Sequence, residues 1–139
     1  MHFNILTLFP ELFPGPLGHS ITGRALAQNI WSYETKNIRD FSTDKHKTVD
    51  DVPFGGGAGM VLRPDVVDAA IVQAKQIVPE ASIIYFTPRG IPLTQSMVRH
   101  AIIPQTTTPT ASLILLCGRF EAVDERLLQA HSITEISLG

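Results

Sequence analysis

Short apolar runs alternate along this chain with stretches in which apolar residues recur every three or four positions. Runs of the first kind, bounded by proline, glycine or polar residues, are typical of buried strands. They cover residues 3–9, 82–87, 111–117 and 133–137. A more polar stretch at 31–41 is rich in β-formers and also favours extended structure. Pro88 and Gly90 predict that the second run ends there.

The helical period is clearest over residues 64–78, where Pro64 suits the first turn of a helix. Weaker helical patterns cover 17–30 and 124–130, and Thr94 is expected to cap the N-terminus of a further short helix. Fully apolar strands need cover on both faces of their sheet. The alternation therefore predicts an α/β domain with a mainly parallel sheet and helices on both faces.

Residues 42–59 hold few large apolar side chains, and we expect no regular element there. The first part, residues 44–51, places Lys45 and Lys47 on either side of His46 and ends in two aspartates. Such a charged run is either an ordinary solvated loop or a strip that contacts phosphate groups. Both interpretations stay open from the residues alone.

The glycine-rich segment at residues 55–59, Gly-Gly-Gly-Ala-Gly, lacks the Gly-Lys-Ser/Thr ending of a phosphate-binding P-loop. It is either a simple turn or a loop whose backbone can approach a flat ligand such as a nucleobase, because no Cβ atoms stand in the way.

Three predicted strands end in small or backbone-exposing residues, at 87–90, 117–121 and 137–139. Ligands of open parallel sheets bind beyond the carboxyl ends of the strands. These three ends therefore predict one pocket. The glycine, cation, aromatic and carboxylate at 118–121 could line a site for an adenosine-like ligand, although an Arg–Glu surface pair is equally ordinary.

Composition excludes a disordered chain and gives no sign of a nucleic-acid partner. The 139 residues include 44% hydrophobic and only 17% charged side chains, with 11 Lys+Arg against 13 Asp+Glu and a net charge of −2. A net charge this close to neutral carries no basic signal. The low charged fraction suggests that some surface is covered by a partner or by a further part of the protein.

Other chemistries are also disfavoured. Cys117 is the single cysteine, and a buried, inert thiol is the favoured interpretation. The five histidines show no metal-ligand spacing, so we expect no metal site. Neither a signal peptide nor a membrane span is predicted, and we expect a cytoplasmic protein.

Read in order, eight segments carry a resemblance to one family. They are Leu8-Phe-Pro10, Thr22-Gly-Arg-Ala25, Arg39-Asp-Phe41, and residues 44–51, 53–60, 85–90, 117–126 and 137–139. Together they resemble the bacterial tRNA (guanine-N1)-methyltransferases, the TrmD family of knotted SPOUT methyltransferases. Two departures are conservative: Ala58 stands where the family commonly has proline, and Phe120 where it has tyrosine. Residues 104–110 look like a local insertion.

The resemblance implies an enzyme that transfers a methyl group from S-adenosyl-L-methionine to N1 of the guanine just 3′ of a tRNA anticodon. It also implies a homodimer with each active site at the subunit interface, and a sheet that contains a trefoil knot. The alternatives are another SPOUT-class RNA methyltransferase, or a non-catalytic module that binds RNA or nucleotides.

The resemblance further implies site residues. The expected cofactor-binding residues lie at the three strand ends: Tyr85, Phe86, Thr87, Pro88, Gly118, Glu121, Ser137, Leu138 and Gly139. Those expected near the guanine or the RNA are Gly59, Lys45, His46 and Asp50.

The family's sequence continues past a Ser-Leu-Gly like that at 137–139 into its proposed general base, an aspartate, and a helical tRNA-binding domain. We therefore expect residues 1–139 to be a SPOUT cofactor-binding domain that is incomplete at its C-terminal end, before the knot is closed. No catalytic residue is expected in it, and alone it should be inactive. Asp50 or Asp51 would be a base only if these residues were the entire enzyme.

Overall fold

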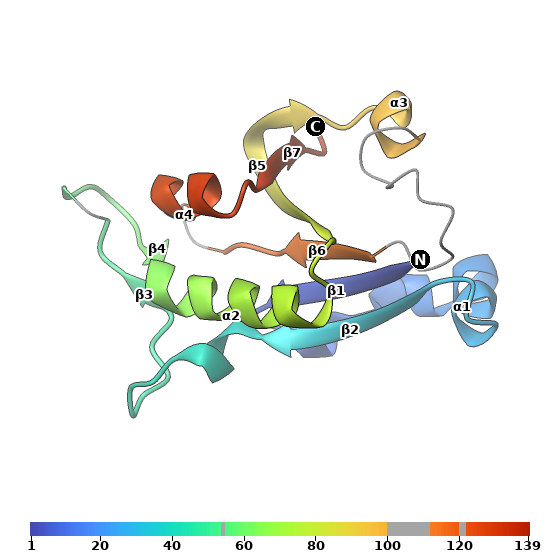
Figure 1. Cartoon of the computed structure of the whole chain (residues 1–139), viewed down its shortest axis with the longest axis horizontal. Coiled ribbons are helices and arrows are strands. Elements are labelled where there is room, and N and C mark those ends of the chain that lie inside the picture. Colours follow the sequence, from blue (N-terminus) through green and yellow to red (C-terminus); the bar gives the residue numbers. More distant parts are fainter. Residues whose placement is uncertain (54, 100–111, 120–121) are drawn as a thin grey trace.

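A five-stranded parallel sheet organises the part of the chain that the computed structural model describes, which is residues 1–53, 55–99, 112–119 and 122–139 (Figure 1). Its strands, in spatial order, are β2 (Ser32–Asn37), β1 (His2–Thr7), β6 (Ser112–Leu116), β5 (Ser82–Pro92) and β7 (Thr134–Ser137). Every neighbouring pair is parallel. The predicted α/β class with a mainly parallel sheet is confirmed.

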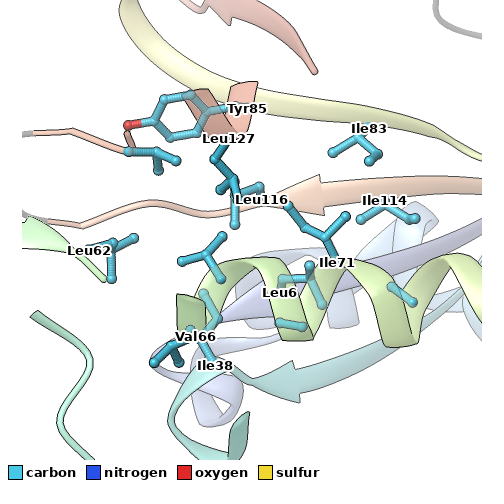
Figure 2. Close-up of a cluster of buried hydrophobic side chains, with 14 of the residues drawn as sticks. Leu6, Ile38, Leu62, Val66, Ile71, Ile83, Tyr85, Ile114, Leu116 and Leu127 are labelled. Carbon is cyan, nitrogen blue, oxygen red and sulfur yellow. The ribbon is translucent and has the colours of Figure 1, made fainter. Parts of the chain in front are cut away.

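One face of the sheet is covered by α2 (Pro64–Ile77) and α4 (Glu125–Ala130). Helix α2 begins at Pro64, as the sequence predicts, and buries its apolar stripe, which includes Val67 and Ile71. The stripe meets inward-facing side chains of the sheet such as Leu6 and Ile114 in the main core (Figure 2). This core holds the sheet and both helices as one layered unit.

The opposite face of the sheet carries the alternate side chains of the same strands, because successive residues of a strand point to opposite sides. Phe3 and Ile5 of β1 and Leu115 of β6 line an apolar cavity of about 210 Å³ there. Its other wall comes from the segment that holds η1 (Pro10–Leu12), η2 (Gly15–Gly18) and α1 (Ser20–Ala27). Both faces are therefore covered by helical segments, as expected.

Several predicted boundaries differ from the structure. The helix expected over 17–30 is confined to α1, with a 3₁₀ turn before it. The extended stretch expected over 31–41 ends at Asn37, whose side chain accepts a hydrogen bond from the Arg39 amide and starts η3 (Ile38–Phe41). The Asn37 cap decides the second boundary, and the apolar pattern does not predict this cap.

The stretch over 42–59, expected to hold no regular element, contains the two-residue strand β3 (Asp50–Asp51), paired antiparallel with β4 (Val61–Leu62). The Thr94 cap is confirmed, since its hydroxyl accepts a hydrogen bond from the Met97 amide at the start of α3 (Gln95–Met97). The predictions made for residues 100–111 lie outside the described residues. None of the described helices has the length and apolar character needed to cross a lipid bilayer.

Candidate functional site

Strand β5 does not end at Pro88, so the predicted end is wrong. Its register with β7 runs regularly up to Phe86, which pairs with Ile136, and resumes at Ile91, which also pairs with Ile136. Residues 87–90 therefore form a bulge, and the Leu93 amide beyond it donates to the Ser137 carbonyl at 2.8 Å. Proline and glycine interrupt the ladder locally, but pairing with β7 continues on both sides of them.

The bulge forms one wall of a groove of about 220 Å³. Phe86, Thr87 and Pro88 lie on the β5 side of the groove. The other wall is the end of β7 and the residues after it, Ser137, Leu138 and Gly139. The structure thus brings together two of the three strand ends that the sequence predicts to share a pocket.

The third strand end lies against the opposite side of β5. Tyr85 is 6% exposed and packs in the main core with Leu116 and Leu127 (Figure 2). Phe86, the next residue of the strand, packs against a second apolar cluster on the opposite face of the sheet. A Cβ atom on Gly118 would lie 2.6 Å from Cε2 of the Tyr85 ring. Gly118 therefore touches the back of the groove's strand without lining the groove. Glu121 lies outside the described residues.

Burial shapes the titration of two groups near this end of the sheet. Desolvation raises the pKa of the Tyr85 phenol, whose oxygen also takes a hydrogen bond from the Val123 backbone. Burial likewise raises the pKa of the Cys117 thiol. A thiol with a raised pKa is a poor nucleophile, which agrees with the inert interpretation. Within the described ranges no three His, Cys, Asp or Glu side chains cluster as a metal site would require.

The charged loop at 44–51 is organised around the carboxylate of Asp44. This carboxylate accepts hydrogen bonds from the Ser42 hydroxyl at 2.6 Å and from the backbone amides of His46 and Thr48. These hydrogen bonds, the one from Ser42 first, hold the pKa of Asp44 well below its usual range. Lys45 and His46 stand exposed on the loop that Asp44 folds.

Arg63 fixes this loop to the start of α2. Its guanidinium contacts Asp44 at 3.1 Å and Asp65, in the first turn of the helix, at 2.6 Å. Its backbone amide donates to the Val49 carbonyl at 2.8 Å. Sequence reasoning missed Arg63, because a basic residue directly before a helix has no local pattern that pairs it with an aspartate 19 positions earlier.

The glycine-rich segment lies in the hairpin between β3 and β4. Gly59 and the three glycines at 55–57 all have positive φ. In Figure 1 this hairpin projects past α4, away from the part of the sheet where the bulge of β5 and the end of β7 form the groove. None of its described residues lines that groove. Of the residues expected near the RNA, Asp50 pairs with Leu62 in the hairpin, and Lys45 and His46 belong to the preceding loop.

Replacing Asp44 with asparagine should reduce the loss of stability in acid. The pKa of Asp44 is lower in the folded state than its ordinary value of 3.8. The ionised carboxylate therefore stabilises the fold fully at pH values above that ordinary pKa. That contribution is lost as the pH falls through the lower folded value. Urea midpoints measured from about pH 6 down to about pH 2 should fall more steeply for the wild type than for Asp44→Asn. If the urea midpoints of the two proteins fall equally with pH, Asp44 does not hold this loop.

Comparison with known proteins places the chain in a family. The family model described as tRNA (Guanine-1)-methyltransferase TrmD matches residues 1–139, the whole chain. A tRNA (guanine-N(1)-)-methyltransferase from Rhodospirillum rubrum is 56% identical over 135 residues, covering 97% of this chain and 53% of that protein. The chain therefore belongs to the TrmD tRNA (guanine-1)-methyltransferase family, and the resemblance carried by its motifs is confirmed.

Two further relatives carry the same name. The protein from Zymomonas mobilis is 52% identical over 136 residues, which are 98% of this chain and 52% of that protein. The protein from Rickettsia akari is 49% identical over 139 residues, which are 100% of this chain and 57% of that protein. The chain thus spans about half the length of the curated relatives it matches.

Proposed function

We propose that residues 1–139 form the cofactor-binding domain of a cytoplasmic tRNA (guanine-N1)-methyltransferase. The reaction would move the methyl group of S-adenosyl-L-methionine to N1 of the guanine 3′ of the anticodon. The observation that carries this proposal is the groove where the bulge of β5 meets the end of β7, in a chain that matches the family throughout. The knotted topology and a helical tRNA-binding domain belong to the same proposal.

The residues of the groove fit part of this cofactor. Leu138 and Phe86 offer apolar contact area, while the bulge at 87–90 and residues 138–139 leave backbone groups outside the regular ladder, where they can pair with a nucleoside. Pockets that enclose a whole ligand of this size usually hold about 300–1,000 Å³. A groove of about 220 Å³ suits one portion, and we assign it to the nucleoside. Glu121, which follows β6 in the sequence, is proposed to support the cofactor.

The chemistry requires groups beyond the groove. Guanine N1 carries a proton at neutral pH, so a carboxylate must remove it while a cationic or hydrogen-bonding group stabilises the charge that develops on O6. Asp50 and Asp51 lie in the β3–β4 hairpin, away from the groove. In agreement with the family resemblance, we propose that the base is neither of them and lies outside residues 1–139. The residues of the groove would hold the donor methyl in line with N1.

We assign the loop and hairpin on the other side of α4 to the tRNA. Lys45 and His46 are exposed and presented by the folded Asp44 loop, where they can contact phosphate groups. Gly59 would approach the guanine and Asp50 would hold the hairpin. Because this hairpin and the groove lie apart on one chain, a homodimer is the proposed arrangement in which one subunit's hairpin meets its partner's groove.

Apolar surface near α1 supports the homodimer. Leu12, Leu17 and Ile21 are 65%, 53% and 72% exposed. Large apolar side chains gathered on one segment are typical of surface that is covered in an assembly. A second subunit is the proposed cover, and it would also explain the low fraction of charged residues.

The test uses calorimetry on residues 1–139 and a methylation assay on the whole enzyme of which they form the proposed domain. We expect S-adenosyl-L-methionine to bind, and methyl transfer to occur on a tRNA with guanine 3′ of the anticodon but not on the same tRNA with adenine there. Methylation at N1 blocks base pairing, so a reverse-transcription stop locates it. Transfer to the adenine-substituted tRNA would favour another RNA target, and binding without any transfer would favour a non-catalytic module.

Gly59→Val should reduce methyl transfer by about 100-fold while the dissociation constant of the cofactor stays within about twofold, because Gly59 is placed at the guanine and not at the groove. Gly55→Val is the matched control, since Gly55 has a similar positive φ and open space around it. An equal loss of transfer in both variants would mean that loop strain, and not the position of Gly59, is responsible.

A further inference from the structure

Arg89 joins the bulge of β5 to two other elements. Its Nε donates to Oε1 of Glu135 in β7 at 2.8 Å, and one terminal nitrogen donates to Oε2 of Glu125 at 2.8 Å. Glu125 is the first residue of α4. One side chain therefore connects the bulge, the edge strand and the helix beside them.

This connection matters because the bulge lacks the regular ladder pairing of the residues on either side of it. Within the described residues, the β5–β7 register passes from Phe86 directly to Ile91, so residues 87–90 have no ladder partners. Pro88 has no amide hydrogen to donate. Thr87 and Pro88 line the groove, whereas the next residue, Arg89, reaches to the carboxylates of α4 and β7.

Arginine suits this task better than lysine does. Its planar guanidinium offers several N–H groups in fixed directions, so two carboxylates on different elements can be held at once. A lysine ammonium is a single point charge on a flexible stem and would hold one of them less rigidly. The fork geometry at Arg89 fixes the direction of the backbone that carries it.

The exposure of the three side chains separates positioning from stability. Arg89 and Glu125 are 52% and 57% exposed, and Glu135 is 26% exposed. Ion pairs this open to solvent contribute little to the free energy of unfolding. Even so, a bulge whose four residues are already held in one conformation loses less conformational entropy when a ligand binds, and binding is then tighter.

We propose that Arg89 is a positioning residue of the cofactor groove, which holds Thr87 and Pro88 in the binding conformation through Glu125 and Glu135. We call Arg89, Glu125 and Glu135 the clamp. The identity of the ligand, S-adenosyl-L-methionine, rests on the proposed function, whereas the clamp rests on geometry alone. Arg89 itself is not among the residues that line the groove.

The experiment compares Arg89→Met, Arg89→Lys and Glu135→Gln by calorimetry with S-adenosyl-L-methionine. We expect about a fivefold to tenfold weaker affinity for Arg89→Met and a smaller loss for Arg89→Lys. The double variant Arg89→Met/Glu135→Gln should lose less than the product of the two single losses, because both remove one interaction. Melting temperatures should stay within about 2 °C of the wild type. Added salt should weaken binding by the wild type more than by Arg89→Met.

Arg126→Met is the control, since Arg126 is an exposed arginine of α4 that pairs with Asp124. Hydrogen exchange of the peptide covering 86–92 gives a readout that needs no ligand, and exchange should be faster in Arg89→Met than in either the wild type or the control. Unchanged affinity together with unchanged exchange would overturn the clamp. If the wild type does not bind the cofactor, the proposed function fails, and the exchange rates alone decide whether the clamp exists.

Discussion

Replacing Gly90 with alanine is expected to destabilise the protein by about 3 kcal/mol and to abolish cofactor binding. A Cβ atom at this position would lie 2.5 Å from the backbone nitrogen of Ile136 and 2.6 Å from its carbonyl carbon. These are backbone atoms of β7, so no side-chain rotation can relieve the clash. Strand β7 must move away from β5, and the groove between them then loses one wall.

Urea denaturation measures the stability change, and calorimetry with S-adenosyl-L-methionine measures the loss of binding. Ile91→Ala is the matched control, because Ile91 is the next residue of the same strand and is 60% exposed. Its truncation should change the free energy of unfolding by about 0.5 kcal/mol or less. A urea midpoint for Gly90→Ala equal to that of the wild type would show that β7 does not pack on Gly90 as described.

The sequence predicts those parts of the fold that local pattern controls. Helix α2 has an uninterrupted helical period and a proline at its first position, and its predicted start is confirmed. Strands β1 and β6 are apolar runs with both faces covered, which periodicity identifies well. For the same reason the parallel sheet was predictable, since such runs need helices on both sides.

Strand β5 shows where local pattern fails. Pro88 and Gly90 are reliable signals of irregular backbone, and the backbone is irregular there. The strand nevertheless continues to Pro92, because β7, more than 40 positions later in the chain, supplies partners on both sides of the bulge. A break in the ladder and the end of a strand have the same local sequence signature.

The candidate site likewise has a part that the local sequence predicts and a part that depends on long-range contacts. Strand ends rich in glycine and proline predicted a pocket, and the bulge of β5 and the end of β7 do form a groove. The contacts that fix its walls are long-range: Arg89 and Glu135 are 46 positions apart. Nothing in the neighbourhood of either residue indicates the other. Positioning interactions of this kind require the fold before they can be recognised.

Gly118→Ala is expected to weaken cofactor affinity by about tenfold or more, although Gly118 does not line the groove. The new Cβ would lie 2.6 Å from the ring of Tyr85. This ring is confined by the main core, with 6% of the residue exposed and its hydroxyl bonded to the Val123 backbone. Overpacking such a site costs about 1–3 kcal/mol and is relieved by shifts of the backbone. A shift at Tyr85 moves Phe86, the next residue, which lines the groove.

A double variant tests whether the ring transmits the effect. Tyr85→Leu removes the ring atoms that a Cβ on residue 118 would meet, at the expense of a cavity in the core. If the clash causes the loss of affinity, Gly118→Ala should weaken binding far less in the Tyr85→Leu background than in the wild type. If the two losses multiply, Gly118 acts on the cofactor directly, through its own backbone and not through Tyr85. Calorimetry on the four proteins of this cycle distinguishes these two routes from the end of β6 to the groove.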